Sequence, residues 1–276
     1  DSTEFSLPIL VPASKESVAT YGVIDKGAIV QKLAAPSNVI ESIGGLTIST
    51  SSSAMQSLGE SFNYLRNYQY DCSEQVSSRL IAMVSMQDAL LAFGAVKPTE
   101  TGAYKRRIED DIAILEKRQN SPGDFGLWAA AESTKWPYVS IQVTQALLLA
   151  KSKLYPVNER VLNRAVAHLK EIEKDIPAEY DKTAKLALLA RALNIRHLAH
   201  DSDSATAREL LLKAAGEKFD EQAIDKIKSA VPLEMAAWLL PVLKTNQSYN
   251  KEVAFLRKLI NSQISETAST ASANDN

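Results

Sequence analysis

The sequence of 276 residues predicts a mainly α-helical protein that is preceded by a small, incomplete β-sheet. Two observations predict this fold class. Up to residue 50, short runs of β-branched and other apolar residues alternate with turn formers, whereas from Ser51 onward apolar residues recur at three- and four-residue spacing. We therefore expect a β-rich region at 1–50, a helical domain at 51–268 and a polar, disordered tail at 269–276.

The β-rich region contains short strand-like runs that are separated by proline, glycine and polar residues. They read EFSLPILV, ESVATYGVI, GAIVQKL and GLTIST. So few strands bury too little apolar surface to be stable alone. We therefore expect half of a sheet or of a β-sandwich.

The helical domain begins with a face of Met55, Leu58, Phe62 and Leu65. A second helix is expected at 73–91 with Val76, Leu80, Met83, Val84 and Leu90 inward, and a third at 104–118 with Ile108, Ile112 and Leu115 inward. Pro137 suits the first turn of a fourth helix, where its missing N–H is not needed. Helices are then expected at 137–154, 158–175, 180–198, 204–215, 220–229, 232–244 and 249–263. Such helices fit a bundle, an α-solenoid or a closed α/α toroid equally well.

Composition excludes several classes of protein. With 31 basic and 33 acidic residues the net charge is -2, which argues against sequence-independent binding of nucleic acid. The one cysteine cannot form an internal disulfide. His197 and His200 lack the further ligands of a zinc site, and Glu109, Asp110 and Asp111 lie among basic residues as on a solvated helix face. We expect no metal and no cofactor.

One short segment, YQYDCSEQ at 68–75, carries residues with chemistry. Cys72 and Gln75 are spaced so that they share one face of a first helical turn. The start of a helix favours a thiolate, and a thiolate held against a glutamine amide could expel ammonia and close an internal thioester. The alternative is that Cys72 is a small buried apolar residue without chemistry.

The segment from Asn67 to Gln75, followed by VSSRL, resembles the thioester domain of the alpha-2-macroglobulin family, which includes the complement thioester proteins. A second matching block is GDFGLW at 123–128, followed by WPYVS at 136–140. Asp71 stands where the family usually has glycine before the cysteine. The resemblance implies an α/α toroid inserted into a CUB-like β-sandwich, of which residues 1–50 would be one half.

The resemblance also implies which residues form the site. Cys72 and Gln75 map onto the thioester pair, with Glu74 and Tyr70 as neighbours in the motif. Tyr180 lies near the place where some complement relatives carry a histidine that directs the thioester to hydroxyl groups. The chain's histidines are not in a matching context, which favours amines as targets. Aromatic side chains are expected to keep water away, or else simply to pack: Tyr68, Tyr70, Phe125, Trp128 and Trp136.

By this resemblance the chain would be the thioester domain of a broad-spectrum protease inhibitor and not an enzyme. A lysine of the attacking protease would react with the Gln75 acyl group, so the partners are target proteases and the other domains of the parent chain. The expected location is the periplasm, with the parent anchored in the inner membrane as a lipoprotein, or the cell surface, in bacterial defence. Two alternatives stay open: an interaction scaffold with a free thiol, and an α/α-toroid glycosidase.

Overall fold

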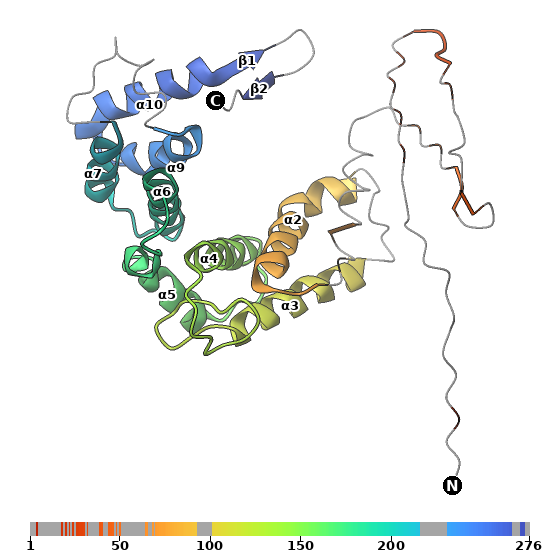
Figure 1. The fold of residues 1–276 in the computed structure, drawn as a ribbon, viewed down its shortest axis with the longest axis horizontal. Coiled ribbons are helices and arrows are strands. Elements are labelled where there is room, and N and C mark those ends of the chain that lie inside the picture. Colours follow the sequence, from red (N-terminus) through yellow and green to blue (C-terminus); the bar gives the residue numbers. More distant parts are fainter. Residues whose placement is uncertain are drawn as a thin grey trace. The chain divides into compact units, whose positions relative to one another are not determined.

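A computed structural model gives the fold of the chain (Figure 1). It describes residues 71–92, 101–215, 231–266 and 271–273, with scattered positions before 71. The chain divides into two units, 1–50 and 51–276. The strands expected in the first unit and the first expected helix lie largely outside the described residues, and the helix expected at 220–229 lies wholly outside them.

The described part of the second unit is mainly helical, as predicted. The helices are α2 (Ser73–Ala92), α3 (Thr101–Lys117), α4 (Pro137–Ser152), α5 (Glu159–His168), α6 (Lys182–Leu198), α7 (Ser204–Ala215), α9 (Leu233–Leu243) and α10 (Asn250–Gln263), with the 3-10 turns η2 (Ile172–Asp175) and η4 (Gln247–Tyr249). Strands β1 (Ile264–Glu266) and β2 (Ala271–Ala273) pair antiparallel. Strand β2 falls in the tail that was expected to be disordered, and the tail's other residues lie outside the described part of the chain.

One predicted helix is wrong in its length. The single helix expected over 158–175 is divided into α5 and η2. After His168 the backbone tightens, because the N–H groups of Lys170 and Glu171 bond to carbonyls three residues back. This tighter winding ends the α-helix.

The inward faces of α2 and α3 are confirmed where their side chains are described. Val76, Leu80, Met83 and Val84 of α2 pack in one core with Ile108, Ile112 and Leu115 of α3. Burying an aliphatic side chain of this size stabilises the fold by about 1.5–3 kcal/mol. The period in the sequence was therefore sufficient to find the core between these helices.

Helix α4 lies at the centre of the group formed by α2, α4, α5 and α6 (Figure 1). It packs against α2, α5 and α6, and it buries side chains on most of its circumference. Ile141 connects it to Ala192 and Ile195 of α6, beyond which α6, α7, α9 and α10 share a second core. Among the described residues, no helix has the length and apolar character needed to cross a membrane.

Candidate functional site

Cys72 lies directly before the first residue of α2. Its carbonyl oxygen accepts the N–H of Val76 at 2.9 Å, which makes Cys72 the N-cap residue and Gln75 the third residue of the helix. A glutamine at this third position characteristically reaches back towards the N-cap. The thiol is free and only 7% exposed. The local fold therefore brings a buried thiol and a glutamine amide to the same end of one helix.

The Gln75 amide is held weakly. Its Nε2 donates to the Tyr68 hydroxyl over 3.5 Å, at the long limit of a hydrogen bond. Its Oε1 is buried and has no hydrogen-bond partner among the residues that the structure describes. A buried polar atom without a partner costs about 1–3 kcal/mol. The amide is therefore in an unfavourable environment for an unreacted side chain.

The block GDFGLW holds the start of α2. The Ser73 N–H donates to the Leu127 carbonyl at 2.7 Å, and the Ser73 hydroxyl donates to the Gly126 carbonyl at 2.7 Å. Arg118 donates to the same hydroxyl at 3.3 Å. Burial lowers the pKa of Arg118, and the nearby carboxylates of Asp71 and Glu132 oppose that effect. The two sequence blocks of the resemblance thus meet at the residue after Cys72.

The loop that carries this block is shaped by two glycines and one carboxylate. A Cβ on Gly126 would lie 1.7 Å from the Ala129 carbonyl oxygen, and Gly123 has φ +108°. Glu132 accepts the backbone N–H groups of Leu127, Trp128 and Ala129 and the indole N–H of Trp136. Burial alone would raise the pKa of Glu132, but these hydrogen bonds outweigh it and lower the pKa.

A buried ion pair lies one helical turn further along α2. Arg79 is 1% exposed and binds both carboxylate oxygens of Asp111, at 2.9 and 2.7 Å. Its guanidinium also reaches Asp71 at 2.9 Å and the Tyr68 carbonyl at 3.4 Å. Desolvation would lower the pKa of Arg79, but the hydrogen bonds and charges of Asp111 and Asp71 raise it. Arg107 adds longer ion pairs to both carboxylates.

Glu74 is tied to helix α4. Its carboxylate accepts from the Ser78 hydroxyl at 2.9 Å and from the Gln142 amide at 3.2 Å. Gln142 in turn accepts from Arg191 of α6 at 3.3 Å. The structure therefore places Glu74 as a link between the motif and the neighbouring helices.

The aromatic residues expected around the site divide into two groups. Phe125 is fully buried and Trp136 partly buried, both in the core of α2, α3 and α4, which supports plain packing for them. Tyr70 is 64% exposed and Trp128 is also exposed. Tyr68 has edge-to-face contacts with Tyr70 and with Tyr64, at 5.6 and 5.7 Å between ring centroids.

Tyr180 lies in a groove between α4, α6 and α9. The groove has a volume of about 700 Å³, and its polar and aromatic lining includes Tyr138, Arg191, Glu234 and Trp238. No residue from 68–75 is among the residues that line this groove. Its assignment as a neighbour of the thioester stays a prediction.

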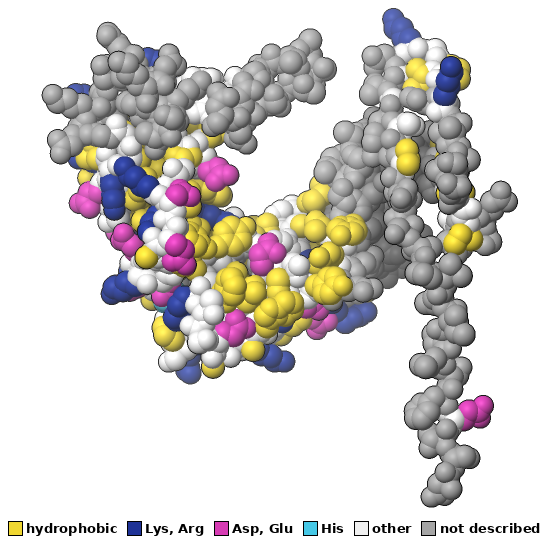
Figure 2. Space-filling model, viewed as in Figure 1, with side chains coloured by type: hydrophobic (Ala, Val, Ile, Leu, Met, Phe, Trp, Pro, Cys, Tyr) yellow, Lys and Arg dark blue, Asp and Glu magenta, His cyan; other side chains and the backbone are white. Residues whose placement is uncertain are grey.

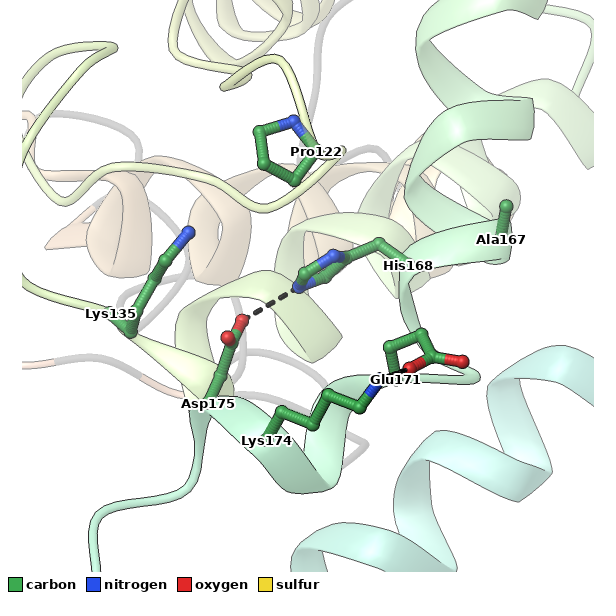
Figure 3. Close-up of a pocket in the computed structure, with 7 residues that line it drawn as sticks. All are labelled: Pro122, Lys135, Ala167, His168, Glu171, Lys174 and Asp175. Atoms are coloured by element: carbon green, nitrogen blue, oxygen red, sulfur yellow. Dashed lines mark hydrogen bonds and ion pairs between the residues drawn. The ribbon is translucent and has the colours of Figure 1, made fainter.

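A smaller cavity of about 420 Å³ lies beside η2, where the His168 ring faces Asp175 at 2.8 Å and Lys135 approaches from another segment (Figure 3). His197 contacts the Ser202 hydroxyl at 2.6 Å. Within the described residues, no group of three or more His, Cys, Asp or Glu side chains is placed to hold a metal ion. The rings of His168 and His197 are therefore each paired with a polar side chain close by in the sequence.

Sequence reasoning did not find Ser73, Arg79, Asp111 or Gln142 as parts of the site. A signal for Arg79 was present, because a charged residue at 79 falls on the buried face of Val76, Leu80 and Met83. A charge on such a face requires a buried partner. Asp111 lies in the acidic run that was interpreted as a solvated face, but its side chain is fully buried.

No protein-family profile matches the chain. It is 35% identical over 102 residues to an alpha-2-macroglobulin homologue of Yersinia pestis, a match that covers 37% of this chain and 5% of that protein. The native E. coli alpha-2-macroglobulin shares its fold, with a TM-score of 0.56 over 73% of this chain and 12% of that one, at 18% identity. The expected resemblance to the bacterial alpha-2-macroglobulins is confirmed.

The chain also matches a protein that is not named as an alpha-2-macroglobulin. The circularly permutated Ras protein 2 of Dictyostelium discoideum is 25% identical over 262 residues, which is 90% of this chain and 6% of that protein. The chain therefore spans only a small part of the curated relatives it matches. The prediction that it is not an enzyme agrees with the alpha-2-macroglobulins, which are protease inhibitors.

Proposed function

We propose that Cys72 and Gln75 close an internal thioester. The Cys72 thiolate attacks the side-chain acyl carbon of Gln75, the C–N bond breaks, and the amide nitrogen leaves as ammonia after taking up a proton. The new bond joins Sγ to that carbon. The product is an acyl group that is much more reactive towards nucleophiles than the amide it replaces.

The observation that carries this proposal is the buried, unpaired Oε1 of Gln75 at the same helix end as a buried free thiol. An amide oxygen is a strong acceptor, and it is costly to bury without a donor. A thioester carbonyl is a weaker acceptor, so closure reduces that cost. The start of α2 also favours the thiolate that must attack and, later, leave.

The function that follows is covalent capture of a protease. A lysine amine of the target attacks the Gln75 acyl carbon, the C–S bond breaks, and Cys72 leaves as the thiolate while the amine loses its proton to water. The chain keeps the target through a new amide bond and is consumed, so this is inhibition without turnover. A crystal structure exists of Salmonella alpha-2-macroglobulin reacted with methylamine, a structural relative with a TM-score of 0.53 and 19% identity.

The proposal includes two features of the fold, an α/α toroid and a CUB-like β-sandwich. The successive packing of α2 to α4, α4 to α6 and α6 to α9 fits part of an α/α toroid. Residues 1–50 would supply half of a CUB-like β-sandwich. The partners would be the remaining domains of a longer macroglobulin chain and the target proteases, in the periplasm or at the cell surface.

Covalent labelling by a primary amine tests this function. Purified chain is incubated with a fluorescent primary amine, with and without prior methylamine, and with Cys72→Ala as the matched control. The proposal predicts one covalent label per chain at Gln75, blocked by methylamine and absent from the variant. Labelling of Cys72→Ala at the same level would contradict it.

A further inference from the structure

Asp71, the residue before Cys72, is part of an ion-pair cluster that is centred on Arg79. We propose that Asp71 is a positioning residue, which fixes the turn before Cys72 by clamping it onto the buried Arg79–Asp111 pair. This inference rests on the proposed thioester function and names a residue on which its geometry depends.

The Arg79 guanidinium is a fixed anchor for this clamp. Both members of the Arg79–Asp111 pair are fully buried, so their positions are set by the packing of α2 against α3. Arginine's planar fork binds Asp111 through two parallel hydrogen bonds, which fixes its orientation as well as its place. One Nη2 group then serves both Asp111 and Asp71, at 2.7 and 2.9 Å.

Asp71 connects the lead-in segment to this anchor. Its side chain is 41% exposed, in contrast to the buried pair, and Arg107 approaches it from α3 at 3.5 Å. Arg79 also donates to the Tyr68 carbonyl at 3.4 Å. The same guanidinium therefore holds the residue before the thiol and the residue whose hydroxyl contacts the Gln75 amide.

The backbone at Asp71 shows why a side chain can replace glycine here. Positive φ angles among the described non-glycine residues occur at Ala131, Leu154 and His200, so Asp71 is not in the left-handed region. Glycine's conformational freedom is not needed at 71. An aspartate at this position limits the free movement of the turn and adds an electrostatic connection to α2 and α3.

The test compares Asp71→Asn, Asp71→Gly and Asp71→Glu with the wild-type 276-residue chain. The exposed Asp110 on α3 provides the control Asp110→Asn. Two quantities are measured: the thioester content, by intact mass and free-thiol titration, and the rate of Cys72 alkylation by iodoacetamide after methylamine treatment. Circular dichroism checks that helix content is kept, as expected because Arg79 retains Asp111.

The clamp predicts less thioester and faster alkylation in Asp71→Asn and Asp71→Gly, by about two- to fivefold, the range that a partly exposed ion pair supplies. Asp71→Glu should restore part of the effect, and Asp110→Asn should match wild type. Added salt should speed alkylation of the wild-type chain, because salt screens the ion pair between Asp71 and Arg79. It should not change the rate of Asp71→Asn, which lacks this ion pair. A merely structural role would not give this salt difference.

Asp71→Gly restores the glycine that the family usually has before the cysteine, so it shows whether this chain depends on the aspartate. Equal thioester content and equal alkylation rates in Asp71→Gly and wild type would overturn the positioning role. If wild type has its full mass and a free Cys72, the proposed thioester function fails in this chain. The alkylation rates and their salt dependence still decide the role of Asp71 in that case.

Discussion

The backbone N–H of Ser73 donates a 2.7 Å hydrogen bond to the carbonyl oxygen of Leu127. The first N–H groups of a helix have no partner within the helix, so they require one from elsewhere. Leu127 supplies it from a loop more than fifty residues along the chain. This bond fixes where α2 begins, and therefore where the Cys72 thiol lies.

Ser73→Ala should destabilise the domain by about 1–3 kcal/mol, because the Gly126 carbonyl and the Arg118 guanidinium both lose a buried partner. Urea unfolding measures the change. The matched control is Ser152→Ala at the exposed end of α4, where the hydroxyl bonds only within its own helix. An equal loss of stability in both variants would contradict the role assigned to Ser73.

Gly126→Ala should prevent the loop from holding its observed shape, since the new Cβ would lie 1.7 Å from the Ala129 carbonyl oxygen. We expect a large drop in the melting temperature and a smaller thioester fraction. Gly102→Ala is the control, because its nearest neighbour is the Arg106 side chain at 3.5 Å. There alanine should stabilise α3 by about 0.4–1 kcal/mol.

Asp111→Asn should cost about 3–5 kcal/mol, because it leaves the buried Arg79 charge without its main partner. Chemical denaturation measures this loss, with Asp110→Asn as the exposed control on the same helix. A loss of less than about 1 kcal/mol, the usual value of a surface pair, would show that this cluster is not buried as described.

Acid should remove a contribution to stability that Asp124 makes. This carboxyl is 1% exposed; burial alone would raise its pKa, but hydrogen bonds from Lys135 and Asn120 outweigh burial and lower it from the ordinary value of 3.8. The unfolded chain binds the proton more readily than the folded chain does. The stabilisation by the ionised Asp124 is therefore complete above pH 3.8, and it is lost as the pH falls through the lower pKa of the folded state.

Asp124→Asn should therefore flatten the acid side of the stability profile. Denaturation midpoints of wild type and variant, measured across the acid range, show whether their difference shrinks with falling pH. A difference that stays constant down to the lowest pH would contradict this assignment. Asp110→Asn again provides the exposed control.

The sequence predicted those features that depend on local period and spacing. The inward faces of α2 and α3 followed from apolar residues at helical spacing, and the position of Cys72 at a helix start followed from the break before 73. The end of α5 at His168 did not follow, because the tighter winding after it has no marker such as glycine or proline.

The partners of the site could not be read from local sequence. The bonds of Ser73 to Leu127 and of Arg79 to Asp111 depend on how a loop and a helix approach α2 in three dimensions. Hydrophobic side chains gather on the face of the helical unit that Figure 2 shows, among charged residues of both signs.

The intact mass of freshly purified chain, measured with and without methylamine beside a free-thiol titration, tests the central claim most directly. A Cys72–Gln75 thioester predicts a mass short by one ammonia, no free thiol, and uptake of one methylamine with release of one thiol. Full mass with Cys72 open to alkylation from the start would contradict the claim that this chain closes a thioester.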